Sequence, residues 1–287
     1  MSINEWLEML KESNTQWESI KKKFHDKSYL KYEPQFFEAY DGKANDYGIK
    51  LIDTKGDVKS LRQDFTSNIM RDIKSIWQGE VLRLQYDGTV FYKNSTGFVE
   101  EKQIGVELIG LPAPKGDLEI LEMVSELAKA VDGILVISHS DYLKNLLLET
   151  TLNEETSRRL LRVIELKKVE DLKAFELPER TYNQCVNLMA LKNFNLENLI
   201  SVEKVKENIE VLKQLKLYKN IFKNEMEFDL TLNTKYPYYH GIIFQVFLKD
   251  CNQAVITGGR YDTKVNEKTM PAIGFSIDFK AYIGGNQ

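Results

Sequence analysis

Polar residues in two short motifs are spaced so that they could hold a small zwitterionic molecule. Arg62, Asp64 and Thr66 stand in SLRQDFT, at the junction of an expected strand and an expected helix. Gln103 and Glu107 lie four residues apart in KQIGVELIG. Side chains four apart on a strand project from the same face. The carboxylate, hydroxyl and amide groups at these positions suit a zwitterionic small molecule.

A second polar group lies near the C-terminus. Tyr238 and Tyr239 precede the apolar run GIIFQVF, and GGRYD follows at residues 258–262. We interpret both motifs as polar ends of strands in the same antiparallel sheet, so that they complete the first set.

Other kinds of chemistry lack their usual residues. His25, His139 and His240 are widely separated and show no HxH or HExxH spacing. His240, beside two tyrosines, could be a ligand or base, but an exposed turn residue is the favoured interpretation. No GxSxG occurs, Cys185 and Cys251 have no base nearby in sequence, and the glycine pairs lack a phosphate-loop pattern. The sequence predicts no metal and no cofactor.

Composition narrows the class of protein further. The formal net charge is −4, which does not favour nucleic acid or an anionic membrane as a partner. Only eight of the 39 basic residues are arginine. Two cysteines without a paired spacing predict a reducing compartment, and therefore a cytosolic location. The N-terminal residues do not resemble a secretory signal, and no apolar run is long enough for a membrane helix.

The N-terminal part of the chain reads as an antiparallel sheet with helices beside it. Apolar residues at helical spacing predict a docking helix over residues 3–24, and YEPQFFE, with its proline, predicts an edge or interface strand. Alternating runs on either side of Asp87-Gly88 predict a hairpin that turns at this dipeptide. KQIGVELIG supplies a further strand.

The pattern changes at about residue 117. A helix, the buried strand GILVISH and an almost wholly helical stretch over 141–220 follow, and strands then resume at MEFDLTL. We therefore predict an α+β fold with a split antiparallel sheet formed by residues 1–115 and 221–287. Residues 116–220 form a mainly helical insertion in this interpretation.

The ordered motifs resemble one known family. YEPQFFE, IKLIDTKGDVKSLRQDFT, VFYKN, KQIGVELIG, YPYYHGIIFQV, GGRYD and AIGFSID occur in the order seen in the catalytic core of histidyl-tRNA synthetases, which has the class II synthetase fold. The resemblance covers about residues 28–110 and 226–280. It implies that the histidine pocket of that family falls on six positions: Asp64, Thr66, Gln103, Glu107, Tyr238 and Tyr239. Asp64 departs from the usual glutamate but keeps its charge.

Three departures from the family pattern bear on activity. The arginines that grip ATP in the synthetases fall on Tyr92, Thr234 and Ala281. Losing one preorganised cation or donor at such a site costs about 3 kcal/mol, roughly a hundredfold in rate. The sequence also ends shortly after AIGFSID, which implies that the anticodon-binding domain is missing. The resemblance therefore predicts a protein that keeps an amino-acid pocket but does not form an adenylate.

Members of the family with these features act as regulatory subunits of ATP phosphoribosyltransferase, in the first step of histidine biosynthesis. The resemblance thus implies a non-catalytic subunit, a short-form catalytic partner in a hetero-octamer, feedback inhibition by histidine, and a self-dimer through the region around Pro34. Tyr92 and Thr234 replace groups that would help to hold a carboxylate, so histidine could bind at the subunit interface instead. Alternatives are a synthetase-like paralogue that aminoacylates a carrier or senses tRNA, and an active histidyl-tRNA synthetase.

Overall fold

The computed structural model describes residues 2–39, 48–94, 96–148, 150–190, 196–203, 205–232, 239–249, 253–265 and 267–284. The chain divides into two compact units. The first comprises Met1–Leu111 and Thr263–Gln287, and the second comprises Pro112–Asp262. The fold is α+β, as predicted.

The first unit contains a mixed sheet with strand order β1-β5-β6-β13, a three-stranded sheet β2-β4-β3 and the pair β11-β12. Its helices are α1 (Ile3–Asp26), α2 (Phe65–Ile73) and α9 (Phe279–Tyr282). Its strands are β1 (Leu30–Lys31), β2 (Phe37–Ala39), β3 (Lys50–Ile52), β4 (Val58–Leu61), β5 (Leu82–Asn94), β6 (Gly97–Ile109), β11 (Thr263–Val265), β12 (Lys268–Met270) and β13 (Ala272–Asp278).

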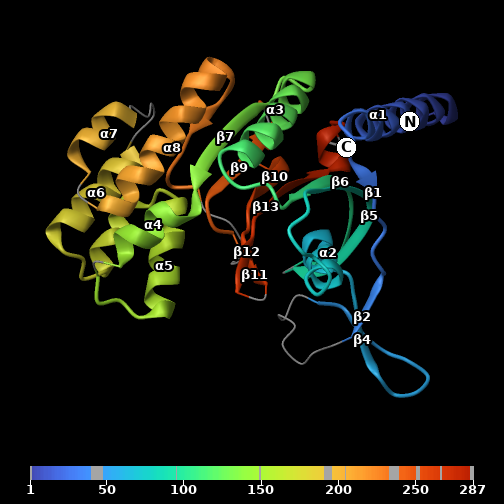
Figure 1. Ribbon diagram of the computed structural model, residues 1–287, viewed down its shortest axis with the longest axis horizontal. Coiled ribbons are helices and arrows are strands. Elements are labelled where there is room, and N and C mark those ends of the chain that lie inside the picture. Colours follow the sequence, from blue (N-terminus) through green and yellow to red (C-terminus); the bar gives the residue numbers. More distant parts are fainter. Residues whose placement is uncertain are drawn as a thin grey trace. The chain divides into compact units, whose positions relative to one another are not determined.

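Strands β5 and β6 form a long hairpin in the sheet of the first unit (Figure 1). Its ladder runs without a break from the pair Leu82–Ile109 to the pair Asn94–Gly97. The predicted turn at Asp87-Gly88 is therefore wrong, because both residues lie inside β5. Gly88 serves a different purpose: a Cβ there would lie 3.0 Å from the Arg62 guanidinium and 3.2 Å from the Phe65 ring. Glycine at this position allows close approach rather than reversal of the chain.

Helix α1 covers one face of this sheet with its C-terminal half. A capping box between Ser2 and Glu5 starts the helix. The Phe24 ring meets Phe275 of β13 edge-on at 5.7 Å, and Trp17 lies under the ammonium group of Lys102 of β6 at 4.0 Å. In the N-terminal half, the apolar side chains at helical spacing stay exposed: Ile3, Trp6, Leu7 and Leu10.

Helix α2 packs on the opposite face of the same sheet. Phe65, in its first turn, stacks on Tyr86 of β5 with ring centroids 4.3 Å apart. Asp64 caps the helix by accepting a hydrogen bond from the backbone N–H of Ser67 at 2.6 Å. This cap fixes where α2 begins, and therefore places Thr66 directly over the strands.

The small sheet β2-β4-β3 exposes apolar side chains. Phe36, just before β2, and Phe37 are about half exposed, and Ile52 of β3 is 76% exposed. Pro34 itself is buried, and its carbonyl oxygen accepts a hydrogen bond from Arg62 at 2.8 Å. The arginine thus anchors the segment that leads into this sheet.

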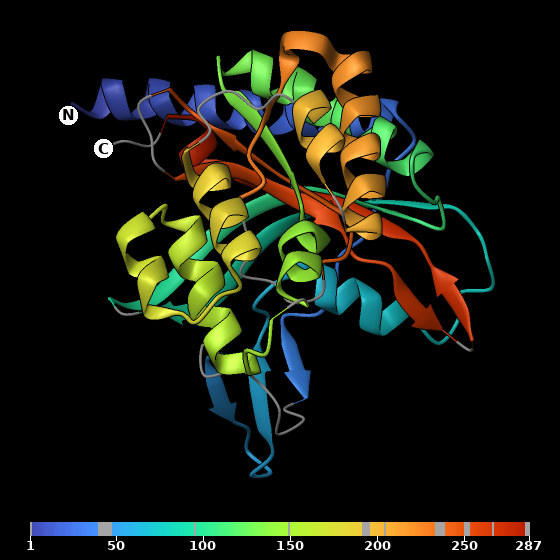
Figure 2. The same ribbon diagram turned by 90° about the vertical axis from the view of Figure 1, so that its left-hand side faces the viewer.

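The second unit combines four strands in the order β10-β9-β7-β8 with helices (Figure 2). Its strands are β7 (Ile134–His139), β8 (Glu227–Phe228), β9 (Ile242–Phe247) and β10 (Ala254–Arg260). Its helices are α3 (Lys115–Ala130), α4 (Ser140–Leu147), α5 (Glu154–Glu165), η1 (Val169–Ala174), α6 (Glu179–Ala190), α7 (Leu196–Val202), α8 (Lys206–Phe222) and η2 (Lys223–Glu225).

The helical stretch predicted for 141–220 is confirmed within the described residues, and GILVISH forms β7. The strands β8 to β10 belong to the same compact unit as these helices. The predicted division was based on the family resemblance and not on which residues form a compact unit. The core of 1–115 with 221–287 and the insertion of 116–220 therefore stay a prediction. Among the described residues, no helix is long and apolar enough to cross a membrane.

Candidate functional site

One face of the β5–β6–β13 sheet carries three of the predicted site residues of the first unit: Tyr92, Gln103 and Glu107. In the antiparallel register, Gln103 lies opposite Asp278, and Glu107 lies opposite Gly274. Directly paired residues project from the same face of a sheet. We call this surface the polar face and define it by five residues: Tyr92, Glu101, Gln103, Glu107 and Asp278.

Thr66 and Glu107 are in direct contact. The Thr66 hydroxyl donates a hydrogen bond to Glu107 Oε1 at 2.5 Å, and the Glu107 side chain is 1% exposed. Gly274 makes room for this carboxylate, because a Cβ at that position would overlap the Glu107 side chain and lie 2.5 Å from the Val106 carbonyl oxygen. The glycine of AIGFSID is therefore part of the site, although its spacing alone did not single it out.

Asp64 lies at the N-terminus of α2, where it caps the helix. Burial raises the pKa of the Asp64 carboxyl, and the hydrogen bonds from Ser67 act in the opposite direction. One carboxylate oxygen is engaged with the backbone, so Asp64 is held in place before any ligand arrives.

Tyr92, Glu101 and Gln103 form a hydrogen-bonded chain on the polar face. The Tyr92 hydroxyl donates to Glu101 Oε2 at 2.8 Å, and Gln103 Nε2 donates to Glu101 Oε1 at 2.7 Å. The Gln103 amide oxygen is then left as an acceptor for a ligand. Glu101 was missed in the sequence, although its even spacing from Gln103 and Glu107 places all three on one face.

The polar face is acidic. Glu101, Glu107 and Asp278 project from it, whereas no lysine or arginine occupies the strand positions of β5, β6 and β13 on this side. Burial is the main reason that the pKa of Asp278 is raised; the charge of Glu101 adds to it, and the charge of Lys280 acts in the opposite direction. Asp278 also caps α9 by accepting the backbone N–H of Ala281 at 3.1 Å. Such a face favours a cationic group over an anionic one.

Arg62 does not face a ligand. It is 1% exposed, and its guanidinium donates to the carbonyl oxygens of Pro34 and Thr89 at 2.8 and 2.9 Å. The guanidinium also lies 4.0 Å from the centroid of the Phe65 ring. Arg62 therefore holds the neighbouring loop, β5 and α2 together.

Tyr239 belongs to the second unit, where its side chain is 9% exposed. Its ring meets Tyr261 edge-on at 6.5 Å, and its carbonyl oxygen accepts from Lys144 Nζ at 3.2 Å. Tyr238 and Thr234 lie outside the described residues. The six-residue histidine pocket therefore stays a prediction as a set.

The arginine of GGRYD is part of a buried ion-pair network in the second unit. Arg260 is 3% exposed and donates from Nε to Asp117 Oδ1 at 2.7 Å and from Nη1 to Asp262 at 3.0 Å. Tyr218 and Gln214 donate to the other carboxylate oxygen of Asp117. Burial and the Asp117 charge raise the pKa of Tyr218, which keeps the phenol protonated. This network fully engages Arg260, so it stabilises α3, α8 and β10 rather than presenting a cation.

The histidines of the second unit are not arranged around a metal. His139 is buried at the end of β7, and burial lowers the pKa of its imidazole. His240 is exposed, and its Nδ1 lies 3.6 Å from Asp141. Within the described ranges, no three histidine, cysteine or acidic side chains form a group that could hold a metal ion.

The chain is similar to proteins of known families. The family model described as histidyl-tRNA synthetase matches residues 27–282. A protein named ATP phosphoribosyltransferase regulatory subunit from Halothermothrix orenii is 29% identical, over 79% of this chain and 59% of that protein. A histidine–tRNA ligase from Sulfurisphaera tokodaii is 28% identical, over 78% and 58%. The chain thus spans about three fifths of the length of these two relatives.

Solved structures show the same fold. A structure described as an ATP phosphoribosyltransferase regulatory subunit/histidyl-tRNA synthetase from Bacillus halodurans has a TM-score of 0.83 at 22% identity, covering 98% of this chain and 80% of that chain. A chain of an ATP phosphoribosyl transferase complex from Thermotoga maritima has a TM-score of 0.74 at 21% identity, covering 93% and 97%. These likenesses support the predicted class II synthetase-like architecture.

Proposed function

The chain belongs to the histidyl-tRNA synthetase family, and on this premise we propose that it is a non-catalytic regulatory subunit of ATP phosphoribosyltransferase. The observation that carries the proposal is the acidic polar face. The resemblance places an ATP-gripping arginine at Tyr92, but Tyr92 is hydrogen-bonded to the carboxylate of Glu101. A triphosphate next to Glu101 and Asp278 would meet like charges.

The same face suits part of a histidine molecule. The carboxylates and the free acceptor of Gln103 can take the α-amino group or an imidazole N–H, and Thr66 holds Glu107 in position for this role. A ligand bound here would have to find partners for its own carboxylate elsewhere. Histidine could regulate the assembly only to the extent that it binds one quaternary state more tightly than the other.

The relatives support a partner subunit. The protein from H. orenii is named a regulatory subunit, and the T. maritima structure is titled as a phosphoribosyl transferase complex. We propose that this chain joins a short-form catalytic subunit in a hetero-octamer that is inhibited by histidine. The catalytic activity belongs to the partner in this proposal.

A self-dimer through the region around Pro34 forms part of the proposal. Phe36, Phe37 and Ile52 present apolar surface on one small sheet, and such surface is stabilised when another chain covers it. Replacing Phe37 with Asp should shift the sedimenting species from dimer to monomer at micromolar concentration. Phe98 at the tip of β5–β6 is 79% exposed, so Phe98→Asp is the matched control and should leave the dimer intact.

Reconstitution tests the assignment directly. The chain is co-expressed with a short-form ATP phosphoribosyltransferase, and the phosphoribosyl transfer rate is measured with and without histidine. The proposal predicts co-purification, a rate higher than that of the catalytic subunit alone, and inhibition by histidine. A catalytic subunit whose rate and histidine response are unchanged by this chain would refute it.

Calorimetric titration of histidine locates the effector site. Glu107→Gln removes one charge from the polar face and should weaken binding about tenfold, the loss of one charge-assisted hydrogen bond. Glu100→Gln is the matched control, because Glu100 lies on the same strand but projects from the opposite face. Equal affinities in the wild type and both variants would move the histidine site to another surface.

The histidine–tRNA ligase relative makes an active synthetase the second candidate. Histidine-dependent exchange between ATP and pyrophosphate measures adenylate formation. The acidic polar face predicts no exchange above background. Robust exchange, or charging of tRNA or of a carrier, would replace the regulatory proposal with one of these activities.

A further inference from the structure

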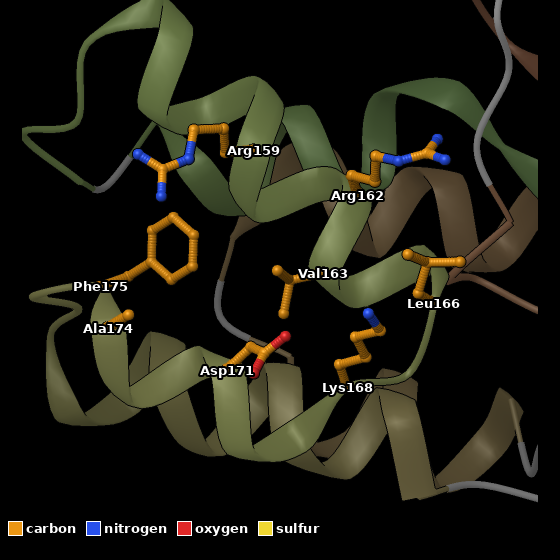
Figure 3. A pocket seen from close by; sticks show the side chains of 8 residues that line it. All are labelled: Arg159, Arg162, Val163, Leu166, Lys168, Asp171, Ala174 and Phe175. Carbon is orange, nitrogen blue, oxygen red and sulfur yellow. The ribbon is translucent and has the colours of Figure 1, made fainter. Parts of the chain in front are cut away.

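A pocket in the second unit lies between α5 and η1, outside the residues discussed above (Figure 3). Its volume is about 320 Å³, at the lower end of the range for small-molecule sites. The residues that line it are Arg159, Arg162, Val163, Leu166, Lys168, Asp171, Ala174 and Phe175.

The periodicities of two helix types bring these side chains together. On α5, Arg159, Arg162 and Val163 follow the three- and four-residue spacing of one helical face. At the start of η1, Lys168 and Asp171 are three apart, and a 3-10 helix has three residues per turn, so that such side chains lie in line. The two rows face each other across the pocket in Figure 3.

The pocket lining carries an excess of positive charge. Arg159, Arg162 and Lys168 contribute three cations and Asp171 one anion, so the formal charge of the lining is 3 − 1 = +2. None of these four charged groups has an ion pair within 4.0 Å among the residues that the structure describes. This charge excess contrasts with the net charge of −4 for the whole chain.

Neighbouring cations outside the pocket do have acidic partners. Each forms an ion pair of 3.2 Å or less, and these pairs are Arg158–Glu154, Lys167–Asp229 and Lys173–Glu170. The chain therefore neutralises the basic residues around the pocket but leaves those that line it without a counter-ion.

The floor of the pocket is apolar. Phe175 is 8% exposed, and the Arg159 guanidinium lies 6.0 Å from the centroid of its ring. Ala174 lies beside Phe175, and Val163 lies between the arginines and Asp171 in Figure 3. A ligand that fills the pocket would lay a compact apolar body on this floor while its anionic group meets Arg162 and Lys168.

We propose that this pocket binds a small phosphate monoester, with the dianionic phosphate on Arg162 and Lys168, which lie on the same side in Figure 3, and the body of the ester toward Phe175 and Arg159. Guanidinium groups match the geometry of phosphate oxygens, and a dianion balances the +2 lining. Asp171 accepts a hydrogen bond from a hydroxyl or amino group of the ligand. The site is independent of the proposed regulatory function, since none of its residues belongs to the polar face.

Titration of the whole protein with phenyl phosphate at low ionic strength tests this site, with inorganic phosphate and succinate as comparison probes. Phenyl phosphate should bind tighter than either, because only it combines a phosphate with a ring for the floor. Arg162→Gln should lower its affinity about tenfold, through loss of a charge-assisted hydrogen bond. Arg158→Gln is the matched control on the same helix and should leave the affinity unchanged, because Arg158 is already paired with Glu154.

Three outcomes would overturn the proposal. Phenyl phosphate could fail to bind at low ionic strength, or Arg158→Gln could weaken its binding as much as Arg162→Gln. Alternatively, a poly-glutamate peptide or a duplex RNA could bind through Arg162 without competition from phenyl phosphate, which would make the surface a macromolecular one. Circular dichroism of the Arg162→Gln and Arg158→Gln proteins checks that any loss of binding is not caused by unfolding.

Discussion

The polar face of the first unit and the Asp117–Arg260 network of the second unit both bury charged groups, but they stabilise them differently. In the network, a carboxylate meets a guanidinium, and a phenol and an amide satisfy the remaining oxygen. On the polar face, Glu101 and Glu107 have hydroxyl and amide partners among the described residues, and no cation occupies the strand positions beside them. The first arrangement pairs opposite charges directly, whereas the second gathers acidic side chains on strand positions that hold no lysine or arginine.

The largest expected effect is on the network. Asp117→Ala leaves Arg260 buried without its main partner, and breaking a buried pair in this way costs about 3–5 kcal/mol. Urea unfolding followed by circular dichroism measures the change. Asp262→Ala is the control, because Asp262 is partly exposed and its loss should cost about 1 kcal/mol or less. Equal losses in the two variants would mean that Asp117 is not the principal partner.

The next effect concerns the room that Gly274 leaves for Glu107. Gly274→Ala forces a methyl group against the carboxylate and the Val106 carbonyl, so we expect a loss of about 1–3 kcal/mol, as for overpacking elsewhere. Ser276→Ala, on the same face of the same strand, should change the free energy of unfolding by less than about 0.5 kcal/mol. A neutral Gly274→Ala would show that Glu107 can move aside, and would weaken its role as a fixed group.

A smaller effect is expected at Thr66. Thr66→Val keeps the shape but removes the hydroxyl that donates to Glu107, and the loss of one hydrogen bond costs about 1 kcal/mol. Thr66→Ser retains the donor and should recover most of the loss. The free energies of unfolding of the three proteins at pH 7 give the comparison. If serine and valine are equally destabilising, the methyl group of Thr66 matters more than its hydroxyl.

The smallest effect is a dependence of stability on pH from His139. Burial lowers the pKa of this imidazole in the folded state, near Asp141, Asp117, Lys144 and Gln214. The unfolded chain then binds the proton first, so stability falls as the pH drops through the unfolded value near 6.5. For one such histidine the loss between pH 7 and pH 6 is at most about 0.7 kcal/mol. His139→Asn should reduce this slope.

The periodicity of apolar residues and the order of the motifs were sufficient to predict the α+β class, the helical stretch and the strands that carry Gln103 and Glu107. These features depend on local patterns and on alternation along one strand. The predicted turn at Asp87-Gly88 was wrong because the local turn preference of this pair is overridden where the strand must leave room for Arg62 and Phe65.

The partners of the buried arginines could not be read from the sequence. Arg62 donates hydrogen bonds to Pro34 and Thr89, and Arg260 donates to Asp117. These partners are far apart in the sequence, so no local pattern reveals them. Both arginines had been grouped with the polar tips of a ligand site. Their donors are directed into the protein instead, which leaves the polar face more acidic than the residue types alone indicated.

The exposed half of α1 gives the protein a built-in optical reporter. Trp6 is 42% exposed, whereas Trp17 on the same helix is 8% exposed. Indole emission moves to shorter wavelength when water is removed from the ring. Any chain that covers the outer part of α1 will therefore shift the fluorescence of Trp6 while that of Trp17 stays constant, so that coverage of this helix can be followed at nanomolar dilution without attaching a dye.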